Sequence, residues 1–142
     1  MDSTHEQIFQ RYMYAGAVSR DADTVAALFT DDGVYDAPLA PDGHPLHRRL
    51  VGRDAIRAGI GAYHRQPAYR AAMNPARTTV VLHDTTDPDV FVAELDVVFD
   101  DDGRRTRMSL VQIFRVRDGR IVMLRDYFTE QPSPDTAEGD GR

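Results

Sequence analysis

The second half of the sequence is a run of strand-like segments separated by short turns, and this pattern constrains the fold more than any other feature. The expected strands are Thr78–His83, Val90–Phe99, Arg105–Arg117 and Arg120–Glu130, all rich in β-branched or apolar residues. Turn sequences ending in Asp-Gly separate the last three strands, at residues 100–103 and 118–119. Such turns favour hairpins, so we expect these strands to pair antiparallel.

The first half is predicted to contain three helices, over Thr4–Ser19, about Ala22–Phe29 and about Asp54–Tyr63. Ser3 or Thr4 can cap the first helix, and Glu6 or Gln7 supports its first turn. Between the second and third helices we expect an Asp31–Gly33 helix stop, a short strand at Val34–Ala37 and a long loop at Leu39–Leu50.

Helices followed by antiparallel strands indicate an α+β fold, in which one sheet packs against three helices. The concave face of such a sheet leaves room for a small-molecule pocket. The 142 residues are enough for one domain. We expect it to span residues 1–130, followed by a flexible tail at 131–142 that is rich in Pro, Gly and Asp. The other face of the sheet must be covered or paired, which favours a homodimer through the sheet.

Composition excludes several kinds of chemistry. The sequence has no cysteine, and all 17 basic residues are arginine, so thiol nucleophiles, thiolate metal sites and lysine Schiff bases are excluded. The net charge of -6 disfavours nucleic acid and anionic membranes as partners. His44 and His47 are expected to be exposed, without a third ligand at metal-binding spacing. We therefore expect no metal and no cofactor. With no apolar run of ~20 residues and no signal peptide, a cytoplasmic protein is expected.

The most specific motif is VQIFRVRDGRIVMLRDYFTE, at residues 111–130. It resembles the closing hairpin of the SnoaL-like proteins, which belong to the nuclear-transport-factor-2-like superfamily. Three earlier segments agree with this resemblance in the expected order: DADTVAALFTDDGVY, GRDAI and ELDVVF. The resemblance implies a curved antiparallel sheet wrapped around three N-terminal helices, forming a cone with an internal pocket. It implies no single activity, because isomerases, cyclases, dehydratases, epoxide hydrolases and binding proteins share this fold.

Within the superfamily, the segment Arg125–Phe128 is similar to the RDYF motif of limonene epoxide hydrolase, and this similarity implies a catalytic role for Asp126. The long strand of that enzyme carries an Arg-x-Asp pattern that corresponds to Glu94 and Asp96, which implies that Asp96 is a second catalytic aspartate. Tyr35 matches the tyrosine before the loop. Two positions depart from that pattern, because Glu94 replaces an arginine and Ala37 replaces an asparagine that helps hold water.

The resemblance to ketosteroid isomerase is more distant. An ungapped match places Met13 and Ala37 on its tyrosine and its base, with Tyr12 and Asp36 one residue away. Its second acid falls on Gln112, whose neutral amide suits binding better than acid catalysis.

Asp126 shares one face of the last strand with Leu124 and Phe128. Apolar neighbours disfavour the charged carboxylate, so we expect the pKa of Asp126 to be raised into the range of a proton donor. The alternative is an ordinary ion pair with a nearby arginine.

Asp96 and Glu94 share one face of the preceding long strand, and an apolar row from Phe91 to Phe99 shares the other. If the two acids face the pocket, Asp96 and Asp126 form an acid–base pair with divergent pKa values, and the apolar row is free to form a dimer interface. If they face solvent, the apolar row is core. The length of the hairpin turn decides between these arrangements. A three-residue turn, Asp101–Gly103, would place Asp96 beside Met108.

These interpretations together predict a cofactor-independent cyclase or isomerase acting on a small apolar biosynthetic intermediate, such as a polyketide- or terpenoid-type natural product. Asp126 and Asp96 are the predicted acid–base pair, with Tyr35 orienting the substrate. Predicted substrate-binding residues are Gln112, Glu94, Asp36, Tyr12, His64, Leu124, Phe128 and Phe114. The alternatives are a limonene-type epoxide hydrolase and a non-catalytic ligand-binding or dimerisation domain.

Overall fold

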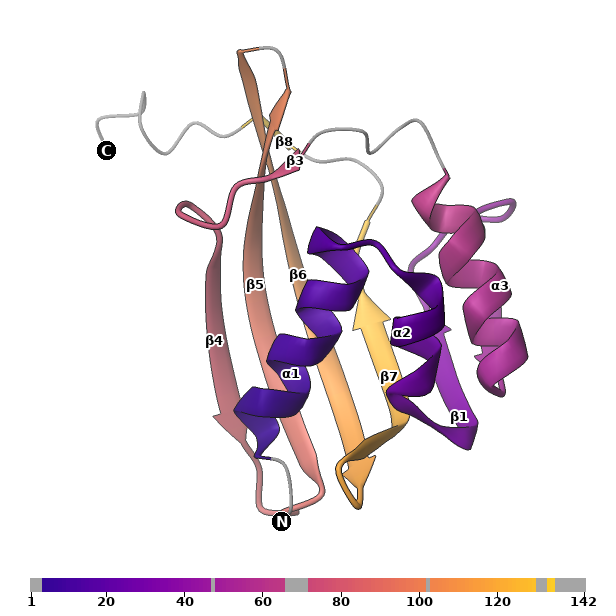
Figure 1. The fold of residues 1–142 in the computed structure, drawn as a ribbon. Helices are drawn as coiled ribbons and strands as arrows, with labels where there is room; N and C mark the ends of the chain where they lie inside the picture. Colours follow the sequence, from indigo (N-terminus) through magenta and orange to yellow (C-terminus); the bar gives the residue numbers. More distant parts are fainter. Residues whose placement is uncertain (1–3, 47, 66–71, 102, 130–132, 135–142) are drawn as a thin grey trace.

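The computed structural model describes residues 4–46, 48–65, 72–101, 103–129 and 133–134. Its helical elements are α1 (His5–Met13), a π-helical segment η1 (Tyr14–Val18), α2 (Ala22–Ala27) and α3 (Arg53–His64). Its strands are β1 (Phe29–Ala37), β2 (Arg48–Val51), β3 (Ala72–Met73), β4 (Thr79–Asp84), β5 (Val90–Asp101), β6 (Arg104–Arg117), β7 (Arg120–Tyr127) and β8 (Ser133–Pro134). Figure 1 shows the helices gathered on one face of the sheet, which confirms the predicted α+β class.

The sheet has the order β2-β1-β7-β6-β5-β3, with β4 also pairing with β5 and β8 with β6. The long hairpins of the second half pair antiparallel, as predicted. The exception to the antiparallel expectation is β1, which pairs parallel with β7. This parallel pair joins the two halves of the chain, and it places the first long strand beside the last.

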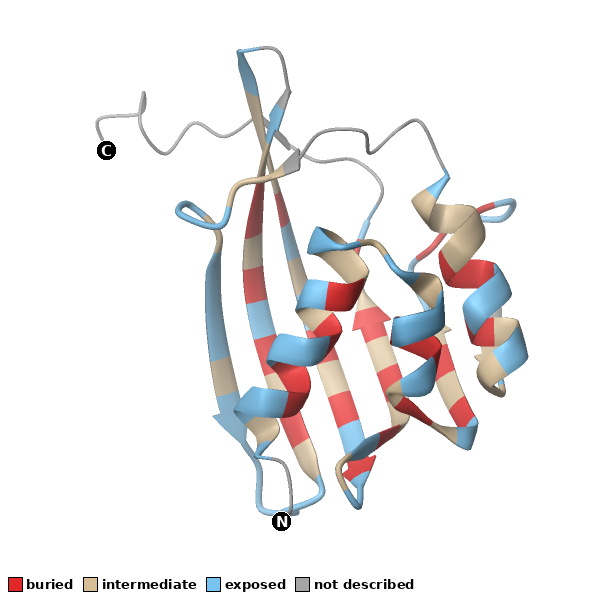
Figure 2. Ribbon diagram, in the orientation of Figure 1, coloured by how far each residue is buried: buried red, intermediate tan, exposed pale blue. Residues whose placement is uncertain are grey.

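The helices form where the sequence predicts them, and their apolar faces pack on the sheet (Figure 2). Thr4 caps α1 in a capping box with Gln7, which confirms the expected start of that helix. From α1, Ile8, Phe9 and Tyr12 are buried. The first helical region continues to Val18 but changes from α- to π-helical hydrogen bonding after Met13. That change lies at the edge of the cavity described below.

β1 begins at Phe29, not at Val34, so the Asp31–Gly33 cluster lies within a strand and does not end a helix. The pairing with β7 shifts register between Phe29 and Val34, as a β-bulge does. Phe29 is fully buried and lies opposite Ile121. Burial of this side chain outweighs the low strand propensity of the acidic cluster.

Gly33 allows the backbone of this bulge to approach Phe29. A Cβ atom at residue 33 would lie 2.9 Å from the Phe29 Cβ and 3.0 Å from the Thr30 carbonyl oxygen. We expect Gly33→Ala to lower the free energy of unfolding by about 1–3 kcal/mol, because backbone and core must shift. Urea denaturation measures this change. Gly16→Ala is the control: a Cβ there meets nothing within 4 Å, so its stability should not fall.

The predicted loop at Leu39–Leu50 contains the edge strand β2, which pairs antiparallel with β1. The sequence does not predict this strand because the segment contains prolines and charged residues, which have low strand propensity. His44, in the same region, is buried, contrary to the expected exposure, and its Nδ1 accepts a hydrogen bond from the Leu46 backbone. His47 lies outside the described residues.

The predicted tail at 131–142 lies outside the described residues except for Ser133–Pro134, which pair with β6 as β8. Within the described part of the chain, no helix is long and apolar enough to cross a membrane. The same residues contain no group of three or more histidines and acids arranged to hold a metal ion.

Candidate active site

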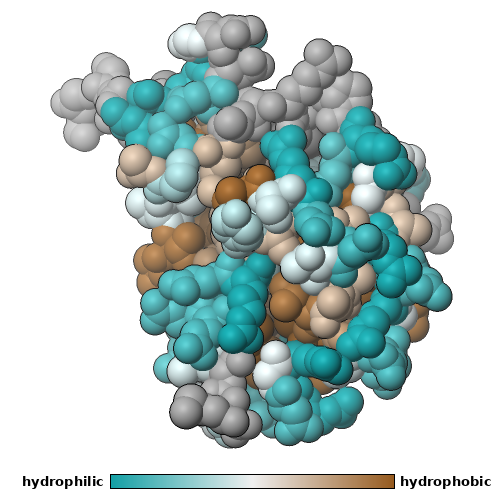
Figure 3. Space-filling view, viewed as in Figure 1, coloured by the Kyte–Doolittle hydropathy of each residue, from teal (hydrophilic) through white to brown (hydrophobic). Residues whose placement is uncertain are grey.

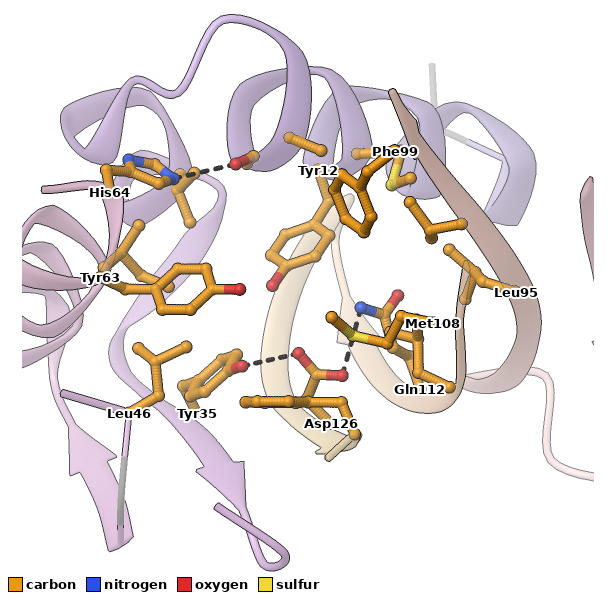
Figure 4. A pocket seen from close by; sticks show the side chains of 18 residues that line it. Tyr12, Tyr35, Leu46, Tyr63, His64, Leu95, Phe99, Met108, Gln112 and Asp126 are labelled. Atoms are coloured by element: carbon orange, nitrogen blue, oxygen red, sulfur yellow. Dashed lines mark hydrogen bonds between the residues drawn. The ribbon is translucent and has the colours of Figure 1, made fainter. Parts of the chain in front are cut away.

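A cavity lies between the concave face of the sheet and the helices (Figure 4). It encloses about 710 Å³ of empty space, including its open mouth. Apolar side chains from η1, α3, β5 and β6 form most of its wall. Its polar lining residues are Tyr12, Tyr35, Tyr63, His64, Gln112 and Asp126.

Among the described residues that line the cavity, Asp126 is the only carboxylate. Its side chain comes from β7, where alternation turns Asp126 inward and its neighbours Arg125 and Tyr127 outward. Asp126 is 6% exposed. Burial raises its pKa to about 6, although hydrogen bonds from Tyr35 and Gln112 oppose the rise. The raised pKa agrees with the expectation drawn from its apolar neighbours. A carboxyl group with this pKa can both accept and return a proton near neutral pH.

Tyr35 holds Asp126 in place. The two side chains lie on the neighbouring strands β1 and β7, and the Tyr35 hydroxyl donates to Asp126 Oδ2 at 2.6 Å. Tyr35 is 1% exposed, and burial raises its pKa well above the usual range. It therefore stays protonated and acts as a hydrogen-bond donor to the carboxylate.

Two more tyrosines direct hydroxyl groups into the cavity from the helical side. Figure 4 shows Tyr12, from α1, and Tyr63, from α3, pointing toward the same space as Asp126. Burial raises the pKa of Tyr12 well above its usual range, and the Asp126 charge adds to the rise. Tyr12 is thus a neutral donor at physiological pH.

Gln112 lies opposite Asp126 in the β6–β7 register. Its Nε2 donates to Asp126 Oδ1 over 3.4 Å, a long hydrogen bond. The carboxylate therefore receives one donor on each oxygen. Both donors favour the charged form, whereas burial favours the neutral form.

His64, at the end of α3, lies at the cavity edge, where its Nε2 hydrogen-bonds the Gly16 carbonyl oxygen at 2.9 Å. Because a carbonyl only accepts, Nε2 must carry the proton. Burial lowers the pKa of His64. The ring is therefore neutral at pH 7 and links α3 to η1.

The structure does not bring Asp96 to Asp126. The β5–β6 register pairs Asp101 with Arg104 and Asp96 with Ser109, so a two-residue connection replaces the expected three-residue turn. This difference turns Val97 and Met108 into the cavity and Asp96 out of it. On the outer face, Asp96 accepts a hydrogen bond from the Ser109 hydroxyl. The expected acid–base pair is therefore wrong.

Glu94 shares the outer face with Asp96 and contacts His83 of the neighbouring strand β4. It does not line the cavity. The apolar row of β5, including Phe91 and Leu95, instead packs in the core. That row cannot serve as a dimer interface, and association through the opposite face of the sheet stays a prediction.

The other predicted binding residues divide into two groups. Phe128 lines the cavity, as do Tyr12, His64 and Gln112. Leu124 and Phe114 point to the same side of the sheet but are completely buried in the core, away from the cavity. Asp36 faces away from the cavity because it alternates with Tyr35, and its Oδ2 lies 3.4 Å from Arg125 Nε.

Several lining residues were not among the predicted binding residues: Leu46, Ile60, Tyr63, Leu95, Val97, Phe99 and Met108. For Tyr63 a signal existed, because Ile56, Ile60 and Tyr63 recur at helical spacing on one face of α3. Leu46 gave no such signal, since it lies in a segment without periodicity.

The helical side of the molecule is mostly hydrophilic (Figure 3). A hydrophobic area at the left margin lies over β4, the strand on which Val80 and Val81 are exposed. The cavity interior is thus more apolar than the surface that surrounds it.

Comparison with known families decides the identity of the fold. The sequence profile of the SnoaL-like domain matches residues 9–124. The chain belongs to the SnoaL-like domain family. The matched region includes the second half of α1, all of α3 and residues 120–124 of β7. It therefore contains all of the lining residues of the cavity except Asp126 and Phe128. A PhzA/B-like protein of Pseudomonas aeruginosa is 30% identical to this SnoaL-like protein over 110 residues, which cover 76% of this chain and 72% of that protein.

Solved structures agree with this assignment. One of them is SalBIII, an epoxide hydrolase/cyclase-like enzyme in pyran ring formation in the polyether salinomycin. Its structure superposes on this chain with a TM-score of 0.62 at 18% identity, covering 87% of this chain and 88% of SalBIII. An LEH-like epoxide hydrolase of M. tuberculosis superposes on this chain with a TM-score of 0.55 at 24% identity, covering 85% of this chain and 79% of that enzyme. At these identities the likeness concerns the fold, and any activity of this SnoaL-like protein must be argued from its own cavity.

Proposed function

We propose that this SnoaL-like protein is a cofactor-independent acid–base enzyme that isomerises or cyclises a small, largely apolar carbonyl compound. The observation that carries the proposal is the buried carboxyl group of Asp126, which has a pKa of about 6. It lies in a mostly apolar cavity whose few polar groups include tyrosine hydroxyls and the Gln112 amide. A base with a pKa near the working pH transfers protons most effectively.

The first step needs one base and one set of donors. The Asp126 carboxylate takes a proton from a carbon next to the substrate carbonyl, so the C–H bond breaks and a carboxylic O–H bond forms. Negative charge moves to the carbonyl oxygen as an enolate. The Tyr12 and Tyr63 hydroxyls, which point into the same space (Figure 4), are placed to donate hydrogen bonds to that oxygen.

The second step returns the proton. In an isomerisation, Asp126 delivers it to a different carbon of the same molecule. In a cyclisation, the enolate carbon forms a bond to a second carbonyl carbon of the substrate, and Asp126 protonates the alkoxide that results. Either sequence restores the carboxylate and requires no second acid, no cofactor and no water molecule.

Hydrolysis of an epoxide makes different demands, because a water molecule must be held and activated while the leaving oxygen is protonated. Asp96 lies on the outer face, and residue 37 is a buried alanine that cannot hold water. These features support proton transfer within one substrate. The role of SalBIII in pyran ring formation also agrees with it.

The proposal is tested by incubating the enzyme in D₂O with a panel of apolar cyclic and open-chain ketones, and by following the α-protons by ¹H NMR. We expect enzyme-dependent deuterium incorporation into at least one ketone. A parallel panel of apolar epoxides in H₂¹⁸O checks the competing chemistry by mass spectrometry. Diols containing ¹⁸O, without ketone exchange, would show a hydrolase and contradict the proposal.

Tyr35→Phe is expected to move the acid limb of the pH–rate profile upward by about one pH unit or more, because the carboxylate loses its shortest hydrogen bond. The lost bond lowers the pKa of Asp126, so its removal raises that pKa. The initial rate of exchange between pH 5 and 8 measures the shift. Tyr127→Phe is the matched control, since Tyr127 follows Asp126 on β7 but lies on the outer face. An unchanged profile in Tyr35→Phe would disprove this role.

A further inference from the structure

Gln112 contributes a buried hydrogen-bond acceptor that no described residue satisfies. Its side chain is 4% exposed, and its Nε2 is engaged with Asp126. Its Oε1 is buried and accepts no hydrogen bond within the described part of the chain. Figure 4 shows this oxygen directed away from Asp126, toward the end of the cavity near Leu95 and Met108.

Rotation of the amide cannot remove the unsatisfied acceptor while Asp126 is ionised. Turning the Gln112 amide over would bring Oε1 against the Asp126 carboxylate, and two acceptor oxygens repel each other. The NH₂ group therefore stays on the carboxylate side. Gln112 presents an acceptor to the ligand, not a donor.

The surroundings of this oxygen make a partner necessary. The cavity residues of β5 and β6 other than Gln112 are all apolar: Leu95, Val97, Phe99, Met108 and Leu110. A buried acceptor without a donor is unfavourable by more than a typical hydrogen bond contributes. Met108, which lies beside Gln112 in Figure 4, is unbranched and can move aside to admit a ligand group.

We propose that Gln112 determines specificity by accepting a hydrogen bond from a hydroxyl or N–H group of the substrate. The inference rests on the proposed function for the rest of the substrate, whose carbonyl oxygen receives the tyrosine donors. Taken together, the two ends of the cavity fit an apolar ring compound that carries a carbonyl group and, at a distance from it, a hydroxyl group. A compound with an ether or a methyl group in that place leaves Oε1 unpaired and binds more weakly.

The test compares 1-naphthol with 1-methylnaphthalene, which have similar shape but differ in the donor. Equilibrium dialysis at pH 7.5 gives the two dissociation constants for each variant. Wild-type protein is expected to bind 1-naphthol about ten- to a hundredfold more tightly. Gln112→Met keeps the length of the side chain without its acceptor and should reduce the preference to about twofold or less. Val111→Met, next to Gln112 on β6 but on the outer face of the sheet, should retain it.

Equal affinities in the wild type would overturn the inference, and this comparison stands even if Gln112→Met does not fold. A preference that persists in a folded Gln112→Met variant would also overturn it, because another group would then bind the hydroxyl. The binding assay requires no turnover. If the wild-type protein does not discriminate between the two ligands but shows Asp126-dependent ketone exchange, the proposed function stands and the role of Gln112 is wrong. If it discriminates between the ligands but exchanges no ketone, the role of Gln112 stands and the proposed function is wrong.

Discussion

Replacing Asp126 with asparagine is expected to lower the rate of ketone proton exchange by about 10²- to 10⁴-fold, the usual contribution of a general base. Asparagine has the shape of aspartate, and its carbonyl oxygen can still accept the Tyr35 hydroxyl, so the cavity should survive the change. The amide cannot take a proton from carbon near neutral pH. The measurement is the exchange rate in D₂O on the best ketone of the panel, at saturating and at limiting concentration.

Asp96→Asn is the matched control for this experiment. It makes the same chemical change in the same sheet, but on the outer face, where Asp96 accepts from Ser109. Its exchange rate should equal that of the wild type. Full activity in Asp126→Asn, or an equal loss in both variants, would contradict the assignment of Asp126 as the base.

The second large effect concerns stability. The pKa of Asp126 is about 6 in the folded protein, above its ordinary value, because burial disfavours the charge. The folded state therefore binds this proton more tightly than the unfolded state does, and the associated stability is lost as pH rises from about 4 to 6. Above pH 6 the buried charge destabilises the folded protein by about 3 kcal/mol relative to its protonated form.

Asparagine at position 126 carries no charge at any pH, so the difference between the two proteins isolates this contribution from other carboxylates. We expect the free energy of unfolding of Asp126→Asn, minus that of the wild type, to rise by about 2–3 kcal/mol between pH 4 and pH 7. Urea denaturation at four pH values measures it. A difference that stays constant with pH would mean that Asp126 keeps an ordinary pKa.

The sequence was sufficient to predict the fold class and the apolar surroundings of Asp126. Capping at Thr4, helical periodicity and Asp-Gly turns are local signals, and the structure confirms the elements they predict. The raised pKa of Asp126 follows from apolar neighbours on the same strand face, which alternation alone identifies. These features depend on residues close together in the sequence.

The position of Asp96 could not be predicted because alternation shows which side chains share a face, but not which face turns inward. Three consecutive aspartates, residues 100–102, precede Gly103 where β5 turns into β6, and the sequence allows more than one turn length there. A difference of one residue exchanges the two faces of a strand. The same limit applied to Tyr35 and Asp36, and the resemblance to limonene epoxide hydrolase, not alternation, selected the tyrosine. In the structure Tyr35 faces Asp126, and Asp36 lies on the opposite side near Arg125.

The hydrogen bond between Tyr35 and Asp126 joins residues that are 91 positions apart in the chain. β1 can hold Tyr35 beside its partner only after β7 has paired with it, and β7 follows all the other long strands of the described residues. A growing chain therefore cannot assemble the proposed site until residue 126 has left the ribosome. Premature termination before residue 126 yields a product without the proposed base. Activity therefore requires that β1 has paired with β7.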